Sequence, residues 1–462
     1  MSANEVLPKV LEHIDRDLDN SVERLFAFLR IASVSTDPAF AKDCKAAADH
    51  LSADLKSIGF DTSVRETPGH PIVAGSAKGE AGKSVLFYGH YDVQPVDPLN
   101  LWDTPPFEPS IKTVDGRKVI AARGACDDKG QLMTFVEACR AFKAVTGKLP
   151  LPITMMIEGE EECGSSNLLP FIEKNVAEFR KDVALVCDTG MWDATTPAVT
   201  TSLRGLLYEE VTIRCADRDL HSGLFGGAAA NPIRILSRII ADLHDADGRV
   251  TLPGFYDGVA ELPADIKAEL DALGLTAEQF LGGVGLKVPA GEKGRSVLEQ
   301  VSTRPTCDAN GIIGGYTGEG AKTVIAAEAS AKISFRLVGT QDPEKIRTAF
   351  RAFVHERLPA DVTAEFIGHA GSPAIQLPFD SPSLKATRDA LAEEWGKTAV
   401  TAGSGGSIPV VGDFKRVLGM DTLLVGFGLD DDRVHSPNEK YNLSSFHKGT
   451  RSWARILAAL AE

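Results

Sequence analysis

Side chains that bind metal ions or transfer protons follow several short apolar runs of this 462-residue chain. The candidate metal ligands are His90, Asp127, Glu161 or Glu162, Asp188 and His435. Four of these positions come just after a predicted strand, which is where an open α/β sheet binds its ligands. Two imidazoles together with several carboxylates favour zinc, with manganese or cobalt as substitutes, over calcium or magnesium.

The number of candidate ligands indicates a site for two metal ions. Five ligands exceed one tetrahedral site, but they fit two metals about 3.5–4 Å apart if one carboxylate bridges them. Such a pair could activate a water near neutral pH and polarise a carbonyl group. Because Glu161 and Glu162 are adjacent, one carboxylate can bind metal while its neighbour takes the proton of the water. Asp92 lies two residues after His90, so one side chain can orient the other.

Each candidate also has a plainer interpretation when it is taken singly. The glutamate run Glu160–Glu162 is typical of a solvated face. Asp127 and Asp128, which precede a helical pattern, are typical of an N-cap whose charge suits the helix dipole. The position of the candidates after strands of one sheet, with two histidines among only ten in the chain, favours a shared site.

The elements that must position these residues alternate along the chain. Apolar periodicity predicts helices at 5–30, Ala46–Ile58, Gln131–Thr146 and Asn167–Asn175, and strands at Phe60–Thr67, Ile72–Ala74, Val85–Tyr88, Pro152–Glu158 and Val183–Cys187. The same texture returns after residue 374, as helix, strand and helix, at Ser383–Trp395, Thr422–Gly426 and Ser444–Leu460. This alternation predicts an α/β fold around one sheet.

Between these two parts the pattern is that of an inserted domain. A strand, a helix, a strand pair, a helix and a strand are predicted in turn at Leu206–Cys215, Pro232–His244, Thr323–Val338, Gln341–Leu358 and Val362–Gly368. Residues 245–310 show little periodicity and are expected to be loop-rich. The order predicts a small antiparallel α+β domain. We therefore expect a catalytic domain formed by residues 1–204 and 375–462, with residues 205–374 inserted into it.

Composition argues against several classes of function. The net charge of −15 and the pI of about 5.2 argue against binding of nucleic acid or of an anionic membrane as the main activity. No apolar stretch approaches the roughly 18 residues of a membrane span, and no secretory signal pattern is visible. Seven cysteines without a CxxC pair indicate reduced thiols. We therefore expect a cytoplasmic protein.

Four motifs resemble those of a family of di-zinc hydrolases with an aminopeptidase fold. They are Gly89-His-Tyr-Asp-Val-Gln-Pro, Arg123-Gly-Ala-Cys-Asp-Asp-Lys-Gly, Glu158-Gly-Glu-Glu-Glu-Cys-Gly-Ser and Arg433-Val-His-Ser-Pro-Asn-Glu. The family contains cytosolic nonspecific dipeptidases, carnosinases, succinyl-diaminopimelate desuccinylases, aminoacylases and glutamate carboxypeptidases, and the motifs are most similar to the dipeptidase branch. The resemblance implies a mixed-sheet, zinc aminopeptidase-like catalytic domain with an inserted α+β lid and dimerisation domain.

The resemblance also implies a role for each candidate residue. The implied ligands are Asp127 bridging two zinc ions, His90 and Asp188 on one ion, and Glu162 and His435 on the other. Glu161 matches the general base, and Asp92 matches the carboxylate that orients His90. The bond between Asp127 and Asp128 is expected to be a cis peptide bond.

Further positions are similar to the family's substrate contacts. His221, in Asp-Leu-His-Ser-Gly, resembles a histidine donated across a dimer to the developing oxyanion. Arg336 resembles the arginine that holds the substrate's carboxylate, a role that suits its bidentate donors; without the family it would be interpreted as a strand-surface charge. Thr323 and Ser407 resemble additional substrate contacts. The glycines of Gly403–Ser407 either bring backbone amides to a substrate carboxylate or simply allow a turn.

The sequence therefore predicts a zinc-dependent dipeptidase that cleaves short peptides with a free C-terminal carboxylate. We expect two Zn²⁺ per chain, a small peptide as substrate and a homodimer formed through the lid domain. An N-acyl amino acid amidohydrolase of the aminoacylase or desuccinylase type is the alternative within the same chemistry. A metal-binding scaffold without catalysis is a third hypothesis, and the presence of Glu161 beside all five ligands argues against it.

Overall fold

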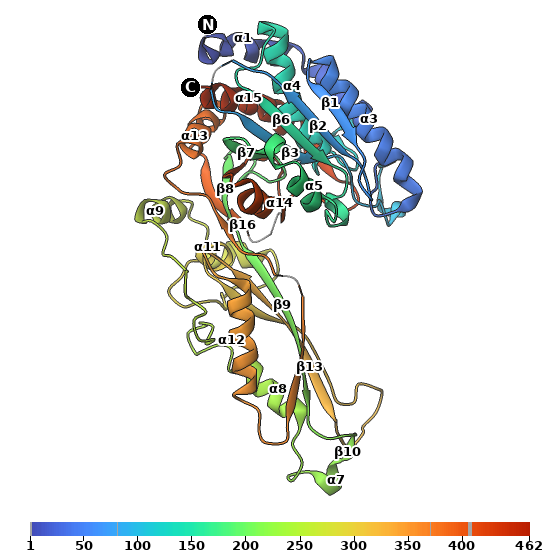
Figure 1. The fold of residues 1–462 in the computed structure, drawn as a ribbon, viewed down its shortest axis with the longest axis vertical. Coiled ribbons are helices and arrows are strands. Elements are labelled where there is room, and N and C mark those ends of the chain that lie inside the picture. The colour runs from blue at the N-terminus through green and yellow to red at the C-terminus, as the bar shows by residue number, and fades with distance from the viewer. Residues whose placement is uncertain (1, 81, 370, 405–408) are drawn as a thin grey trace. The chain divides into compact units, whose positions relative to one another are not determined.

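The computed structural model describes residues 2–80, 82–369, 371–404 and 409–462. The chain forms two compact units, which are described separately here (Figure 1). Unit 1 consists of Met1–Thr201, Leu377–Ala402 and Asp413–Glu462, and unit 2 consists of Ser202–Gln376 and Gly403–Gly412.

Unit 1 is built on a mixed β-sheet whose strands lie in the order β1-β2-β6-β3-β7-β17-β8. Their bounds are β1 Asp61–Arg65, β2 Ile72–Ala77, β3 Val85–His90, β6 Ile153–Glu158, β7 Val183–Val186, β8 Ala198–Leu203 and β17 Thr422–Leu424. Strands β6, β3, β7 and β17 run parallel to one another, whereas β1, β2 and β8 pair antiparallel with their neighbours. The predicted mixed-sheet α/β fold is thereby confirmed.

Helices pack around this sheet before and after unit 2. Their bounds are α1 Ala3–Arg16, α2 Leu18–Leu29, α3 Ala41–Ser57, α4 Lys129–Thr146, α5 Leu168–Lys174, α6 Val176–Phe179, α13 Pro382–Trp395 and α15 Leu443–Leu460. Helix α14, Pro409–Asp413, belongs mostly to the unit 2 segment that ends at Gly412. Phe87 of β3 stacks on Phe135 of α4 with ring centroids 3.7 Å apart, and Trp453 of α15 meets Phe135 edge-on at 5.3 Å. These buried aromatic contacts fix the central strand β3 against the helix pair α4 and α15.

A second, three-stranded sheet lies within unit 1 in the order β18-β5-β4, with bounds β4 Ser110–Val114, β5 Arg117–Ala121 and β18 Lys440–Asn442. Strand β18 pairs antiparallel with β5, so that Lys440 lies opposite Ala121. This pairing brings the segment that precedes β18 beside the segment that follows β5. Both segments carry candidate site residues.

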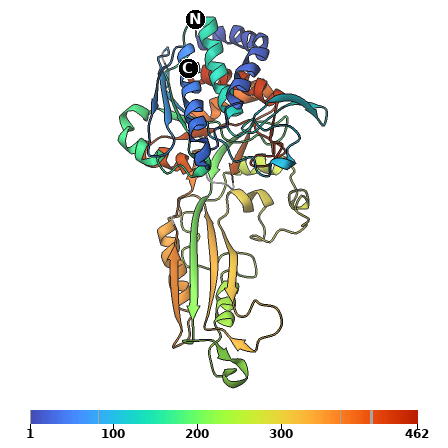
Figure 2. The same cartoon turned by 90° about the vertical axis from the view of Figure 1, so that its right-hand side faces the viewer.

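Unit 2 contains a four-stranded antiparallel sheet in the order β11-β13-β9-β14 (Figure 1 and Figure 2). Its strands are β9 Gly205–Arg214, β11 Thr306–Gly314, β13 Glu328–Leu337 and β14 Thr363–Gly368, and the short strands β10 Leu220–His221 and β12 Val324–Ile325 pair with each other. Two further strands, β15 Ile375–Gln376 and β16 Val400–Ser404, pair with β8 of the large sheet. Its helices are α7 Ser222–Phe225, α8 Pro232–Ala241, α9 Ala264–Ala272, α10 Ala277–Gly282, α11 Val297–Ser302 and α12 Pro343–His355. Alternate residues of β9 and β13, such as Leu207 and Phe335, are buried and form one core with residues of α8 and α12 such as Leu236 and Phe350.

Residues 245–310 are loop-rich, as expected, but they also contain elements that the sequence did not predict. The short helices α9, α10 and α11 form within this segment, and β11 begins at its end. Most residues of α9 and α10 are exposed, so these helices lack the apolar stripe that periodicity detects. Strand β11 is an edge strand that is exposed along most of its length, which removes the alternation expected of a half-buried strand.

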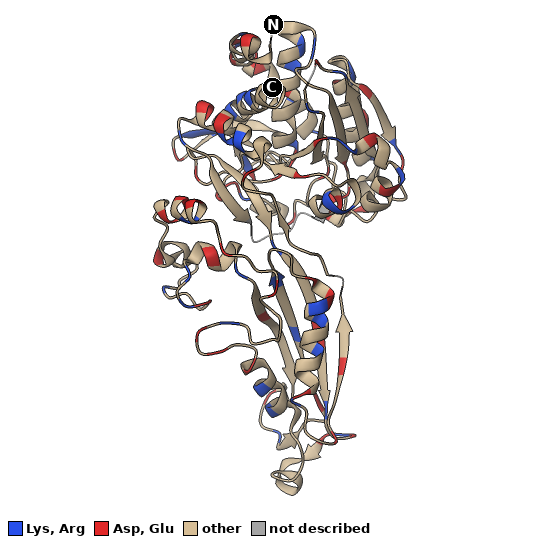
Figure 3. Ribbon diagram, turned by 60° about the vertical axis from the view of Figure 1, so that its left-hand side comes forward, with Lys and Arg blue, Asp and Glu red and all other residues tan. Residues whose placement is uncertain are grey.

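Acidic and basic residues are interspersed along the ribbon of both units (Figure 3). In the part of the chain that the structure describes, no helix is both long enough and apolar enough to cross a membrane.

Candidate metal centre

Parallel strands bring four candidate residues to one edge of the unit 1 sheet. His90 is the last residue of β3 and lies opposite Glu158, the last residue of β6. The segment after β6 turns into a short 3₁₀ helix, Glu161–Cys163. Strand β7 pairs parallel with β3 and ends at Val186, two residues before Asp188. Because these strands run in the same direction, their carboxyl ends meet at one edge, as predicted.

Asp127 lies at the centre of the cluster, with each of its carboxylate oxygens facing a different imidazole. Its Oδ1 is 3.1 Å from Nε2 of His90, and its Oδ2 is 2.9 Å from Nε2 of His435. Asp188 Oδ2 lies 3.9 Å from the first imidazole, and Glu162 Oε2 lies 3.1 Å from the second. The five side chains thus form two groups, each able to hold a metal ion, that share Asp127.

The chemistry of these donors fits a pair of divalent cations. Oε1 of Glu162 is buried and has no hydrogen-bond partner among the described residues, and such a group is costly unless a ligand satisfies it. Hydrogen bonds that His435 donates to the carboxylates of Asp127 and Glu162 raise the pKa of His435 to about 10. The same negative potential favours a bound cation. Nitrogen and oxygen donors in this ratio suit zinc, manganese or cobalt.

Asp92 connects the histidine to the glutamate pair. Its Oδ1 lies 3.3 Å from Nδ1 of His90, and its backbone oxygen lies 3.1 Å from the same nitrogen. The carboxylate also accepts hydrogen bonds from the backbone N–H groups of Glu161, at 3.3 Å, and Glu162, at 3.0 Å. One fully buried carboxylate therefore fixes the His90 ring, with Nε2 aimed at the cluster, together with the backbone that carries both glutamates.

The two neighbouring glutamates have different surroundings. The carboxylate of Glu162 accepts a hydrogen bond of 2.8 Å from Gln94 and lies beside His435. The carboxylate of Glu161 makes no hydrogen bond or ion pair with any residue that the structure describes. Burial raises the pKa of Glu161. An unpaired carboxylate at the edge of the ligand cluster can exchange a proton with a water molecule there.

Sequence reasoning gave no role to Glu439 and Arg123, although both are buried at this centre. Glu439 accepts hydrogen bonds from the backbone N–H groups of Gly124, Cys126 and Asp127, at 2.9–3.0 Å, and pairs with Arg123 at 2.7 Å. Both residues stand within the motifs quoted above, and this membership is the signal in the sequence that could have singled them out. As the resemblance implies, the bond between Asp127 and Asp128 is cis.

Two candidate substrate residues lie together in unit 2. His221 of β10 pairs with Val324 of β12, and the backbone N–H of Ser222 donates to the oxygen of Thr323 at 3.0 Å. Both His221 and Thr323 are exposed. The third candidate, Arg336, is partly buried on β13. Ser407 lies outside the described residues.

Arg336 lies at the opposite end of the unit 2 sheet from His221 and Thr323. It pairs with Leu206 at the start of β9, whereas Glu328 pairs with Arg214 at the end of β9, close to β10 and β12. Eight residues of β13 separate Glu328 from Arg336, which corresponds to about 27 Å of strand. Within one unit 2, these substrate candidates therefore cannot contact the same small molecule (Figure 1).

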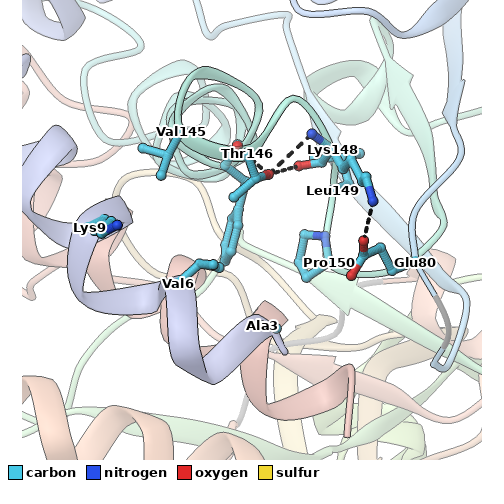
Figure 4. Close-up of a pocket in the computed structure, with 10 residues that line it drawn as sticks. Ala3, Val6, Lys9, Glu80, Val145, Thr146, Lys148, Leu149 and Pro150 are labelled. Atoms are coloured by element: carbon cyan, nitrogen blue, oxygen red, sulfur yellow. Dashed lines mark hydrogen bonds and ion pairs between the residues drawn. The ribbon is translucent and has the colours of Figure 1, made fainter. Parts of the chain in front are cut away.

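A separate cavity of about 280 Å³ lies between α1 and the end of α4 (Figure 4). It is lined by Val6, Lys9, Phe142 and Leu149 among others, with an ion pair between Lys148 and Glu80 at 2.5 Å on its rim. None of the described residues that line it is a candidate site residue.

Comparisons with known proteins agree with this geometry. Residues 86–459 match the family described as Peptidase family M20/M25/M40. The chain is 31% identical to the Cys-Gly metallodipeptidase dug1 of Schizosaccharomyces pombe, over 98% of each protein. It is 29% identical to the human Beta-Ala-His dipeptidase, over 99% of this chain and 93% of that protein.

Solved structures show the same relationship. The di-peptidase Dug1p from Saccharomyces cerevisiae superposes with a TM-score of 0.75 and 29% identity, over 100% of this chain and 99% of that one. The metallo-carboxypeptidase Sso-CP2 from Sulfolobus solfataricus superposes with a TM-score of 0.79 and 30% identity, over 96% of this chain and 99% of that one. With the ligand cluster at the carboxyl edge of its sheet, this chain belongs to peptidase family M20/M25/M40 and is a metallopeptidase.

Proposed function

We propose that this protein is a dipeptidase that uses two Zn²⁺ ions per chain, for which Mn²⁺ or Co²⁺ can substitute. The observation that carries the proposal is the position of Asp127, whose two carboxylate oxygens each face a different histidine. His90 and Asp188 would hold one ion, Glu162 and His435 the other, and Asp127 both. The names of the dipeptidase relatives support small peptides as substrates.

The metal pair, when bound, supplies Lewis acidity to the scissile carbonyl group and to water. Glu161 accepts the proton of the attacking water and returns it to the leaving amine, since its carboxylate has no competing partner among the described residues. Asp92 holds the His90 ring in one orientation and fixes the backbone of Glu161. In this proposal Glu161 acts as the base and Asp92 as the positioning group.

Substrate recognition requires a second chain in this proposal. Arg336 binds the C-terminal carboxylate of the substrate, with Ser407 as a further contact. Because His221 and Thr323 lie at the opposite end of the unit 2 sheet from Arg336, they reach the same substrate only from another chain. The partner subunit's His221 then donates a hydrogen bond to the carbonyl oxygen as it gains negative charge. Residues 205–374 serve as lid and dimerisation domain, and residues 1–204 and 375–462 as the catalytic domain.

The seven cysteines are free thiols, which supports a reducing compartment such as the cytoplasm.

The proposal is tested with a panel of alanyl-alanine, trialanine and N-acetylalanine, assayed before and after chelation and with Zn²⁺ or Mn²⁺ restored. We expect alanyl-alanine to be cleaved fastest, activity to disappear with the metal, and two ions to be measured per chain. Faster cleavage of N-acetylalanine would favour the amidohydrolase alternative. Absence of metal-dependent hydrolysis of any compound would favour the inactive scaffold.

A further inference from the structure

Arg204 is a second arginine on the face of the unit 2 sheet that carries Arg336. It stands two residues before Leu206, the residue of β9 that pairs directly with Arg336 on β13. Side chains of a strand alternate between faces, so residues two apart share a face. Arg204 is the single residue between β8 and β9, and the alternation of partly and fully buried residues along β9 continues back through it to Ser202. This alternation places Arg204 on the same side as Leu206 and Arg336.

The guanidinium of Arg204 has no partner within the described part of the chain. Its Nε is buried without a hydrogen bond, and neither a hydrogen bond nor an ion pair joins its other nitrogens to any described residue. The other buried or nearly buried arginines of unit 2 differ in this respect. Arg304 pairs with Glu292 at 3.0 Å, and Arg347 pairs with Glu209. Arg204 and Arg336 are therefore the two partly buried arginines of unit 2 that have no carboxylate partner among the described residues.

No negatively charged group among the described residues contacts the guanidinium of Arg204. Burial and then the positive charge of Arg336 lower the pKa of Arg204, and Asp308 opposes this effect. Asp308 is exposed and forms no ion pair with either arginine within the described residues, and its Oδ2 lies 3.2 Å from the hydroxyl of Thr306. Holding two guanidinium groups near each other is unfavourable unless an anion joins them. A carboxylate has two oxygens, each able to accept two hydrogen bonds, and so can serve two arginines at once.

We propose that Arg204 and Arg336 together bind the C-terminal carboxylate of the substrate, as two guanidinium groups on one anion. This inference rests on the proposed function, because it takes the peptide's free carboxylate as the ligand. It adds Arg204, to which sequence reasoning gave no role, as a specificity residue for peptides with an unblocked C-terminus. The signal in the sequence is weak, since a single arginine before a strand is common.

The test compares alanyl-alanine with alanyl-alaninamide, whose C-terminal carboxylate is blocked, in wild type and in five variants. Arg204→Gln should raise KM for alanyl-alanine about 10- to 100-fold with little change in kcat, because a hydrogen bond to a charged group is lost. It should leave the slower turnover of alanyl-alaninamide within about twofold. Arg336→Gln should behave similarly, and the double variant should lose less than the product of the two single effects.

Two further variants separate binding from folding and from general charge. Arg204→Lys keeps the charge without the planar donors and should give a KM between those of wild type and Arg204→Gln. Lys332→Gln removes a charge from the same face of β13, four residues from Arg336, and should leave both KM values unchanged. Thermal unfolding of each variant shows whether a change in KM accompanies a loss of fold.

The outcomes distinguish this inference from the function on which it rests. If Arg336→Gln raises KM and Arg204→Gln does not, or if Arg204→Gln weakens both peptides equally, the role of Arg204 is overturned while the dipeptidase stands. If wild type cleaves neither peptide, the proposed function fails and the inference fails with it.

Discussion

Glu161 and Glu162 are chemically identical neighbours, and only their surroundings distinguish them. The side chain of Glu162 is held by Gln94 and lies against His435, whereas the carboxylate of Glu161 makes no such contact within the described residues. A ligand needs a fixed position, and a general base needs a free lone pair near the attacking water. The contacts therefore support Glu162 as ligand and Glu161 as base.

We predict that Glu161→Gln keeps two metal ions per chain and lowers kcat by at least about 10²-fold, in line with the usual contribution of a general base. The amide is the same size as the carboxylate but cannot take a proton. Metal content is measured by atomic absorption and kcat with alanyl-alanine. Glu162→Gln is the matched control and should lose bound metal. The reverse pattern of metal loss would show that the two roles are exchanged.

The sequence identified the ligand candidates because each belongs to a short motif, and four follow a recognisable strand. The structure brings the five side chains together, while their roles remain predictions. Glu439 also stands in one of these motifs, but the motif does not indicate what its side chain does. Its function is to accept backbone N–H groups from Gly124, Cys126 and Asp127, and hydrogen bonds between distant segments leave no local pattern in a sequence. Arg204 was missed for a different reason. What distinguishes it is the absence of a partner among the described residues, and only a structure shows that absence.

At the scale of elements, the segment between β17 and β18 carries His435 and is tied at both ends. Lys440 donates to Asp432 at 2.7 Å, and the same carboxylate accepts the backbone N–H of Leu429 at 2.7 Å. Next to Lys440, Glu439 reaches across to the segment that carries Asp127. Glu439 thus sets the separation of His435 and Asp127, two predicted metal ligands from different parts of the chain.

We predict that Glu439→Gln weakens metal binding about 10- to 100-fold, as loss of an outer contact to a ligand usually does. It should also lower the free energy of unfolding by about 3–5 kcal/mol, because Arg123 then remains buried without its counter-charge. Competition with a chelator measures the first effect and urea unfolding the second. Glu80→Gln, which breaks the exposed pair with Lys148, is the control and should change neither quantity. Unchanged metal affinity in Glu439→Gln would exclude the positioning role.

Prediction of the elements succeeded best for long or strongly apolar patterns, and it missed the short buried strand β8. Strand β3 is buried throughout and α4 follows a long apolar pattern, and both were recognised within about two residues of their bounds. The edge strand β11 and the exposed helices α9 and α10 were missed, because solvent surrounds most of their side chains. The missed edge strand, β11, bears on assembly.

For the molecule as a whole, β11 is an edge strand with an exposed apolar surface. Ile312 and Ile313 are 58% and 63% exposed, and Leu224 of α7 is 78% exposed. Unpaired edges with apolar side chains favour association with another chain. This surface supports the proposed homodimer, which would also supply the substrate contacts that a single unit 2 cannot bring together.

We predict that Ile313→Lys converts the dimer to monomers, keeps the metal ions and lowers kcat about 10²–10³-fold through loss of the partner subunit's His221. Burying a lysine in an apolar contact is unfavourable, whereas the metal centre in unit 1 is untouched. Light scattering after size exclusion gives the mass. Ile367→Lys places the same charge on the other edge strand, β14, where Ile367 is 61% exposed, and should remain dimeric. A fully active monomer of Ile313→Lys would rule out the need for a partner.

The strongest test of shared sites mixes two inactive chains. His221→Ala should lower kcat about 10²–10³-fold with unchanged metal content, because its imidazole acts only as charge develops on the oxyanion. Glu161→Gln is inactive for a different reason and keeps its own His221. After dissociation and re-dimerisation of an equal mixture, half of the dimers contain one chain of each kind, and each mixed dimer rebuilds one complete site. We therefore expect recovery of about a quarter of the wild-type activity per chain.

A histidine that acts only within its own chain predicts no recovery. Differently tagged chains purified as mixed dimers provide the control for exchange, and inactivity of those purified dimers would reject donation across the interface.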